Sequence, residues 1–265
     1  MKEKEICWNI TARCNQNCKY CHRFLNVKDL TLDENLTILK NLIDAGVNCI
    51  TWTGGEALLL DGIDELLKYS YEHNIKNKII TNGKLLTPEK IDKIYRYLDS
   101  VTLSIDSIDD DINDSLGRGR EHRSEIKEIL DYIKFKKYNV KVRINSVVCK
   151  NNIDVFDNLI VFLNDYDIYS WRIFKFMPLR EKAVVNKEKF DITMDEYLNV
   201  VLKVKENSKI KNIDTRIEED MEKKYILILA NGDIVITNNG KDEKVGNALY
   251  DSIEDYVWLS TKENK

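Results

Sequence analysis

The hydrophobic and polar positions follow two alternating periods over the first 180 residues. Short apolar stretches bounded by polar turns predict six strands, at residues 5–10, 48–53, 78–81, 100–105, 140–148 and 170–176. Stretches with helical spacing lie between them, at residues 33–45, 63–71, 88–98, 124–138 and 153–163. The polar segment 106–123 is predicted to be a loop with about one helical turn.

This alternation predicts a parallel sheet with right-handed crossovers. An open doubly wound sheet is allowed, but six strand–helix units match a partial barrel. We therefore expect an α/β fold, with a partial (βα)6 TIM-like barrel over residues 1–180. A small α+β extension over 181–265 is expected to pack on the barrel.

In the extension, a helix is predicted over 194–204 with Thr193 as its N-cap. Asn231-Gly232 predicts a hairpin between strands 225–229 and 233–236, and a terminal helix is predicted over 252–259.

Composition narrows the possible partners. The chain has 265 residues, of which 43% are hydrophobic, so a sizeable core is available. Its net charge of -4 lacks the basic excess of nucleic-acid-binding proteins. No apolar run reaches the roughly 18 residues of a membrane span, and the charged N-terminus does not resemble a signal peptide. We expect a cytoplasmic protein with neither nucleic-acid nor membrane partners.

The cysteines are distributed unevenly. Cys14, Cys18 and Cys21 lie within eight residues, whereas the others are scattered at Cys7, Cys49 and Cys149. A thiolate-bound metal in a reducing compartment fits this pattern better than a disulfide scaffold. A structural zinc site needs a fourth ligand, from His22 or from afar. A four-iron cluster on three cysteines instead leaves one iron open to substrate chemistry. A zinc or redox loop is the alternative at this point.

A second motif, Thr53-Gly54-Gly55-Glu56, ends the second predicted strand. Strand carboxyl ends face the active site in α/β folds. Two glycines let the backbone approach a ligand closely, and Glu56 offers a carboxylate to an ammonium group. Alone this turn is weak evidence, but its place at the strand end after the cysteine loop makes it informative.

With both motifs, residues 6–178 resemble the radical S-adenosylmethionine (SAM) superfamily. The resemblance implies a [4Fe-4S] cluster on the three clustered cysteines and cleavage of SAM to a 5′-deoxyadenosyl radical, which abstracts hydrogen from a substrate. It also implies an electron donor such as flavodoxin or ferredoxin. Gly54, Gly55 and Glu56 would hold the methionine end of SAM. The remaining SAM contacts would be Tyr20, near the adenine, and Asn82, Ser104, Asp106, Asn145 and Ser146.

Three later segments, at residues 116–120, 143–147 and 171–175, look like viperin-like proteins, which are antiviral nucleotide dehydratases and hence lyases. This resemblance implies that Arg118 helps hold the methionine carboxylate and that Tyr225 returns a hydrogen atom. Triphosphate contacts would come from Arg120, Arg123, Arg143 and Lys150.

The residues themselves agree in part with this picture. Arg143, Asn145 and Val147 alternate and so share one strand face. An arginine on the inward face of a barrel is costly unless it meets an anion, such as a substrate or a neighbouring carboxylate.

The sequence departs from these family patterns at four positions. Cys7 and Cys49 replace an asparagine and a lysine that contact substrate, and His22 replaces an aromatic residue. The fourth, Ala57, stands where the radical SAM superfamily as a whole often has proline. Cys7, Cys49 and Cys149 are predicted to be core residues. The first alternative is therefore radical modification of a peptide or other small molecule. The second is a non-catalytic metal-binding module.

Overall fold

The computed structural model describes residues 3–221, 226–238 and 241–257. The strands are β1 Glu5–Thr11, β2 Cys49–Gly54, β3 Lys76–Thr81, β4 Ser100–Ser104, β5 Lys141–Val148, β6 Ser170–Lys175, β7 Ile213–Arg216, β8 Leu227–Ile228, β9 Asp233–Asn238 and β10 Lys241–Asn247. The α-helices are α1 Leu32–Asp44, α2 Ile63–Glu72, α3 Pro88–Ile94, α4 Asp110–Leu116, α5 His122–Lys136, α6 Phe156–Leu163, α7 Arg180–Val185, α8 Lys187–Phe190, α9 Met194–Asn207 and α10 Glu254–Val257. Short 3₁₀ turns are η1 Ala57–Leu59, η2 Tyr95–Tyr97, η3 Ile153–Val155 and η4 Glu218–Met221.

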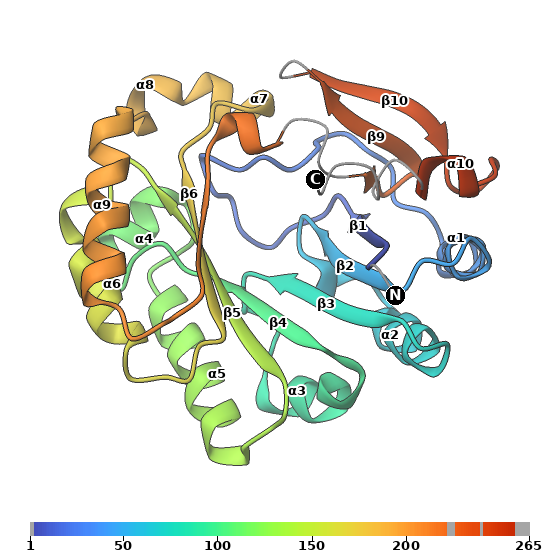
Figure 1. The fold of residues 1–265 in the computed structure, drawn as a ribbon, viewed down its shortest axis with the longest axis horizontal. Coiled ribbons are helices and arrows are strands. Elements are labelled where there is room, and N and C mark those ends of the chain that lie inside the picture. The colour runs from blue at the N-terminus through green and yellow to red at the C-terminus, as the bar shows by residue number, and fades with distance from the viewer. Residues whose placement is uncertain (1–2, 222–225, 239–240, 258–265) are drawn as a thin grey trace.

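The ten strands found in the described residues form one sheet, in the order β10-β9-β8-β1-β2-β3-β4-β5-β6-β7. The six predicted strands are present and pair in parallel from β1 to β6. The sheet curves, with helices around its outer side (Figure 1). It does not close, because β7 and β10 remain its edges. The predicted partial α/β barrel is thus confirmed.

The two faces of the sheet differ in chemistry. Residues that point outward, such as Trp8, Trp52 and Trp171, are fully buried beneath the helices. The inner face carries mostly polar residues, including Asn9, Thr51, Lys78, Thr102, Arg143, Asn145 and Arg172. A closed barrel fills its interior with apolar layers. The inner face of this open barrel is polar instead, which suits the binding of a polar ligand.

Helix boundaries follow capping signals in the sequence. Thr31 and Thr193 each accept a hydrogen bond from the backbone of a glutamate three residues later, whose side chain bonds back to the cap. Such capping boxes satisfy donors that the first turn leaves free. The predicted N-cap at Thr193 is confirmed.

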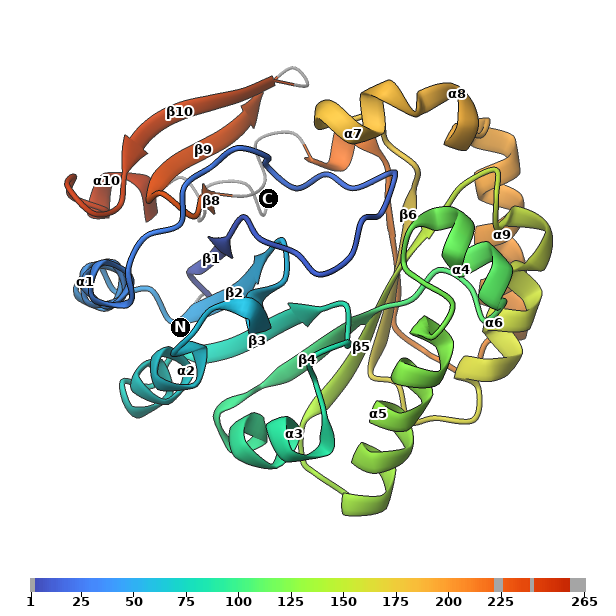
Figure 2. The same cartoon turned by 180° about the vertical axis from the view of Figure 1, so that it is seen from behind.

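The C-terminal part adds strands to both edges of the barrel sheet. β7 pairs in parallel with β6, while β8 pairs in parallel with β1. The predicted hairpin is present, since β8 and β9 are antiparallel around Gly232, whose φ is +82°. β9 and β10 lie on the side of the molecule away from α9, as Figures 1 and 2 both show. The predicted Tyr225 lies outside the described residues.

Several elements differ from the prediction. The segment predicted as a loop at 106–123 contains α4, because the Asp109 side chain caps it by accepting from the Ile112 backbone at 2.9 Å. The helices α7 and α8 and the strands β7 and β10 were also not predicted. No helix in the described part of the chain is long and apolar enough to span a membrane.

Candidate active site

A cavity of about 280 Å³ opens at the carboxyl ends of the central strands. The loop after β1 supplies one wall, and strand ends from β2 to β6 supply the other. Of the residues predicted to bind metal or SAM, twelve line this cavity: Cys14, Cys18, Tyr20, Cys21, Gly54, Gly55, Glu56, Asn82, Ser104, Asp106, Arg118 and Asn145. The structure therefore brings together segments that are up to 131 residues apart.

Two of the three clustered thiols, Cys14 and Cys21, accept hydrogen bonds from nearby N–H groups, whereas the Cys18 thiol donates to Gln16 Oε1 at 3.7 Å. The Gln16 backbone N–H donates to Cys14 Sγ at 3.4 Å, and the Arg23 backbone N–H donates to Cys21 Sγ at the same distance. Asn82 Nδ2 lies 3.8 Å from Cys14 Sγ. Hydrogen bonds of this kind stabilise thiolate ligands and tune the potential of an iron–sulfur cluster.

The spacing of the thiols distinguishes between possible metals. Two sulfurs bound tetrahedrally to one zinc ion lie about 3.8 Å apart. Among the described residues, only Glu3, Glu5 and Cys49 form a set of three ligand atoms within 4.8 Å of one another, so the clustered thiols are spread more widely. Because they still share one cavity, they fit a multi-iron cluster better than a single ion.

Burial favours the protonated form of two of the clustered thiols, Cys14 and Cys18. Burial raises the pKa of Cys18 to about 11, although the Arg118 guanidinium lowers it in part. Burial also raises the pKa of Cys14. Thiols must lose their protons to bind metal, so a metal bound by these cysteines would displace their protons.

Glycine turns clamp the cysteine loop from two sides. On one side Gly55 N–H donates to Thr11 O at 2.7 Å, and a Cβ on Gly55 would lie 2.1 Å from Arg13 O. On the other, Asn17 N–H donates to Gly117 O at 3.1 Å, and a Cβ on Gly117 would lie 2.3 Å from Asn17 O. The Gly-Gly turn was predicted to approach a ligand closely. In the structure, the backbone that it approaches closely is that of the cysteine loop.

Glu56 is almost fully buried at the cavity wall. Its carboxylate accepts from Thr81 Oγ1 at 2.7 Å, from the Asn82 backbone at 2.7 Å and from the Leu58 backbone at 3.2 Å. Burial raises the pKa of Glu56, and these three donors lower it in part. A carboxylate has about four acceptor positions, so one remains for a ligand donor.

A buried ion pair forms the floor of the cavity. Arg118 Nε and the Tyr20 hydroxyl both donate to Asp106 Oδ2. The backbone N–H of Val147 donates to the other carboxylate oxygen at 2.7 Å. Burial alone would lower the pKa of Arg118, but Asp106 raises it well above its ordinary value. Arg118 therefore stays charged, and its charge is fixed beside the cysteine loop.

Gln16 and His122 extend this network, and sequence reasoning missed both. Gln16 Nε2 donates to His122 Nδ1 at 3.2 Å, and Gln16 Oε1 accepts from Arg118 at 3.3 Å. His122 Nε2 donates to the Ser104 carbonyl at 2.8 Å. Gln16 could have been found from its position inside the cysteine loop. His122 carried no signal, because it lies in a segment predicted as a polar loop.

The remaining predicted site residues lie elsewhere. Ser146 points to the outer face, where its hydroxyl donates to Ile105 O. Arg120 is exposed and pairs with Asp111, while Arg123 is exposed on α5. Lys150 borders a separate groove with Asp191 and Glu196. The roles predicted for these residues stay predictions, as does that of Tyr225.

Arg143 shares the inner face with Asn145 but lies nearer the start of β5. Its Nη1 donates to Ser170 Oγ at 3.3 Å, and its guanidinium lies 4.7 Å from the centre of the Tyr169 ring. Its buried Nε has no hydrogen-bond partner among the described residues. Arg143 does not line the cavity itself but precedes Asn145, which does, by two residues on the same strand face.

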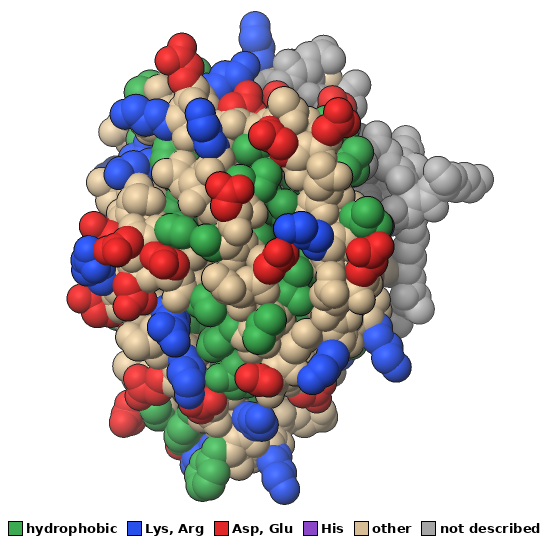
Figure 3. Space-filling model, turned by 90° about the vertical axis from the view of Figure 1, so that its left-hand side faces the viewer, with side chains coloured by type: hydrophobic (Ala, Val, Ile, Leu, Met, Phe, Trp, Pro, Cys, Tyr) green, Lys and Arg blue, Asp and Glu red, His purple; other side chains and the backbone are tan. Residues whose placement is uncertain are grey.

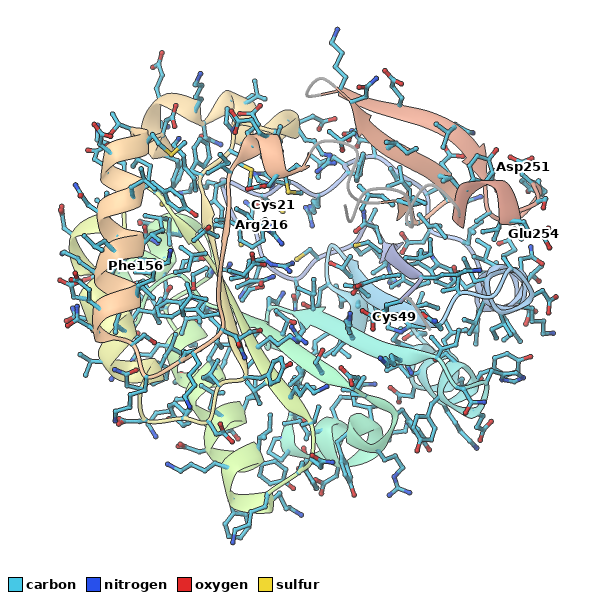
Figure 4. All side chains as sticks on the ribbon, viewed as in Figure 1. Cys21, Cys49, Phe156, Arg216, Asp251 and Glu254 are labelled. Atoms are coloured by element: carbon cyan, nitrogen blue, oxygen red, sulfur yellow. The ribbon has the colours of Figure 1, made fainter. Side chains whose placement is uncertain are left out.

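The scattered cysteines do not join the cavity. Cys49 and Cys149 are buried, and burial raises the pKa of each thiol to about 12. Figure 4 shows Cys49 well away from Cys21. The set formed by Cys49 with Glu3 and Glu5 is occupied by the ammonium of Lys78, 3.2 Å from Glu3 and 2.9 Å from Glu5. Lys78 thus takes the place that a cation would fill.

Comparison with known proteins identifies the family of the chain. Residues 8–163 match the family described as the Radical SAM superfamily. An S-adenosylmethionine-dependent nucleotide dehydratase of Flammeovirga pacifica is 30% identical over 86% of this chain and 80% of its own length. A protein of the same name from Lacinutrix mariniflava is 28% identical over 86% of this chain. This chain spans about half, 49%, of that relative's length.

A solved structure of Streptococcus suis SuiB bound to S-adenosylmethionine superposes with a TM-score of 0.69. It covers 97% of this chain and 65% of its own, at 21% identity, and so supports the fold. The chain therefore belongs to the radical SAM superfamily, as its cysteine loop and Gly-Gly-Glu turn predicted, and it is an enzyme related to proteins named S-adenosylmethionine-dependent nucleotide dehydratases.

Proposed function

We propose that this enzyme dehydrates a nucleoside triphosphate by radical SAM chemistry. The observation that carries the proposal is the meeting of the three thiols, the Gly-Gly-Glu turn and the later strand ends around one cavity. The nucleotide dehydratases named above match the chain over 86% of its length, which supports a nucleotide as the substrate.

We assign Cys14, Cys18 and Cys21 to a [4Fe-4S] cluster. When bound, the cluster would supply the electron that cleaves S-adenosylmethionine and so generates the radical. Glu56 would accept the methionine ammonium through its remaining acceptor position, and the Asn82 amide, 3.8 Å from Cys14 Sγ, would orient the bound cofactor. Arg118 is already paired with Asp106, so its contact with the methionine carboxylate would be shared with that pair.

The anionic substrate would extend along the inner face of β5 to β7. Arg172 and Arg216 both pair with Asp214, at 2.6 and 2.9 Å. Arg172 lies in register with Asn145 on β5, two residues along the strand from Arg143. The Nε atoms of Arg143 and Arg216 are buried without a hydrogen-bond partner among the described residues. One carboxylate paired with two guanidinium groups leaves an excess of positive charge, to which Arg143 on β5 adds, and this excess favours a polyanionic ligand.

The test is reconstitution of the cluster without oxygen, followed by reduction and addition of S-adenosylmethionine with single nucleoside triphosphates. We expect 5′-deoxyadenosine, its formation stimulated by one nucleotide, and a nucleotide product that is lighter by one water. Formation of 5′-deoxyadenosine with no effect of any nucleotide would contradict the nucleotide substrate and favour a peptide or other small molecule. Replacing Arg143 with methionine should abolish the nucleotide stimulation while cleavage without nucleotide continues.

A further inference from the structure

We propose that the outer surface of α7 and α8 is the docking site for an acidic one-electron donor protein of the flavodoxin or ferredoxin class. This inference rests on the proposed function, because that reaction needs an electron from outside the chain. The surface is defined by two exposed valines, Val184 and Val185, and by the lysines around them, Lys19, Lys182, Lys187 and Lys189.

The two valines are unusually exposed for branched apolar residues. Val184 is 55% and Val185 84% exposed, and they are adjacent at the end of α7. Val185 is the most exposed of the large apolar side chains among the described residues. Apolar side chains surrounded by charged ones are typical of protein interaction sites.

The charge around the valines is positive in a chain of net charge -4. Lys19, Lys187 and Lys189 are exposed, and the half-buried Lys182 donates to Asn17 Oδ1 in the cysteine loop. Only two acidic residues, Glu181 and Glu188, lie on the same two short helices. Figure 3 shows lysine and arginine side chains at the upper end of this face, where acidic side chains also lie. A basic rim around an apolar centre complements an acidic partner and speeds its association.

This surface is also one side-chain layer from the cluster ligands. Ala183, the residue before the valines, is fully buried in a small apolar cluster with Tyr20 and Phe190, against which Cys18 packs. Asn186 Nδ2 donates to the Lys19 carbonyl at 3.0 Å, and Lys182 donates to Asn17 Oδ1. Electron transfer slows steeply with distance, so a donor seated on α7 would lie close to the cluster held by Cys18.

The step at this surface would be the transfer of a single electron. The donor loses one electron, and the oxidised cluster gains it. No atom or proton has to cross the interface, so the surface needs only to hold the donor near Cys18. That requirement matches a modest apolar centre with a charged rim better than a deep pocket would.

A second exposed apolar stripe provides the control. Met194, Leu198 and Leu202 lie one helical turn apart along α9 and are 39%, 51% and 54% exposed. α9 packs against α6 on the flank of the barrel, outside the apolar cluster that contains Tyr20. Leu198→Asp therefore changes a comparable side chain without touching the proposed surface.

The test compares Val185→Asp and the double variant Lys187→Glu/Lys189→Glu with the native enzyme and Leu198→Asp. Each reconstituted enzyme is given S-adenosylmethionine with either reduced flavodoxin or dithionite, and 5′-deoxyadenosine is measured. We expect the flavodoxin-supported rate of both surface variants to fall about tenfold at low salt, because complementary charge mainly controls association. The dithionite-supported rate of all four proteins, and the flavodoxin-supported rate of Leu198→Asp, should match the native enzyme.

Flavodoxin binding to each of the four proteins is also measured by interferometry. This measurement does not depend on catalysis, so failure of the docking site can be distinguished from failure of the proposed function. If dithionite fails to drive cleavage in the native enzyme, the proposed function fails, and weaker flavodoxin binding by the surface variants still supports the docking site. Equal flavodoxin binding and equal rates in all four proteins would overturn the docking site. So would surface variants that change the sedimentation of the chain without weakening flavodoxin binding, because the surface would then pair two copies of this chain.

Discussion

At the scale of single residues, the site depends on side chains that are fixed before any cofactor arrives. Arg118 is held by Asp106 and Gln16, and Gln16 is held in turn by His122. Each link is a hydrogen bond between buried groups, so removing one partner leaves another unsatisfied. The three clustered cysteines lie on a loop joined to this network, since the Cys18 thiol donates to Gln16 Oε1.

The first prediction concerns the thiols. Cys18→Ala should leave no stable cluster, since only two ligands would remain, and the reconstituted variant should lose most of its iron and its visible absorbance. Cys149→Ala is the matched control, because Cys149 is buried outside the cavity. Iron and sulfide per chain are the measurement. Equal iron loss in both variants would show that folding, not ligation, had failed.

The second prediction concerns the effect of His122 on the stability of the fold at low pH. Burial lowers the pKa of His122 to about 3. The unfolded chain binds the proton below about pH 6.5 while the folded chain does not, so stability falls as the pH drops below 6.5. This histidine alone should cost about 2 kcal/mol between pH 7 and pH 5.

The test is urea unfolding of the native chain and His122→Gln at both pH values. Glutamine can still donate to Ser104 O but does not titrate. The native chain should lose more stability than the variant over this interval. Equal losses would mean that His122 contributes nothing to the acid sensitivity, and that a different group, such as His22 with its pKa of about 4, accounts for it.

At the scale of elements, the two glycine turns decide where the cysteine loop lies. The end of β2 bonds to one side of the loop, and the end of α4 bonds to the other. α4 is a short helix that begins after Asp109 and ends at Gly117. Because the cysteine loop bonds to the end of this helix, the position of α4 fixes the position of the loop at the cavity.

The third prediction tests this clamp. Gly117→Ala should prevent the loop from seating, because its Cβ would lie 2.3 Å from Asn17 O. Gly119→Ala is a matched control, since both glycines have positive φ, +85° and +95°, but a Cβ on Gly119 would have its nearest contact at 3.6 Å. Both variants should lose about 1–2 kcal/mol through backbone strain. Only Gly117→Ala should also fail to take up iron; iron uptake like that of Gly119→Ala would contradict the clamp.

The sequence was informative about these elements to different degrees. Long periodic stretches predicted all six barrel strands and the helices between them, because burial against the sheet imposes a repeat. α4, α7 and α8 are too short for a repeat to emerge, and β7 is four residues long with every residue half-buried. The cysteine triad was visible because its spacing is local. Gln16 and His122 were not, since their pairing spans 106 residues.

At the scale of the whole molecule, Arg180 ties three distant segments together. Its Nη1 donates to the His22 carbonyl at 3.0 Å, and its Nε and Nη2 donate to the Asp242 carboxylate at 2.7 and 2.9 Å. Its guanidinium also lies 4.1 Å from the centre of the Phe24 ring. Arg180 adopts a φ of +62°, which is uncommon for a non-glycine residue, so the surrounding contacts must hold it there.

The last prediction follows from that junction. Arg180→Met should loosen β9 and β10 and the end of the cysteine loop together, because one guanidinium serves both. We expect a loss of about 1–3 kcal/mol, the size of charge-assisted hydrogen bonds in a partly buried pair. Hydrogen exchange should rise in both segments, at residues 233–247 and 14–24. Arg180→Lys should restore little, since lysine cannot form the two-pronged bond to a carboxylate.

Lys203→Met is the control, because its pair with Asp157 is exposed on both sides and such pairs contribute little. Faster hydrogen exchange in β9 and β10 alone would show that Arg180 stabilises only these two strands and not the cysteine loop. Faster exchange in both segments would mean that the hairpin and the third cysteine are mechanically coupled. That coupling would make the C-terminal strands, which lie far from the cavity in sequence, part of what holds Cys21 in place.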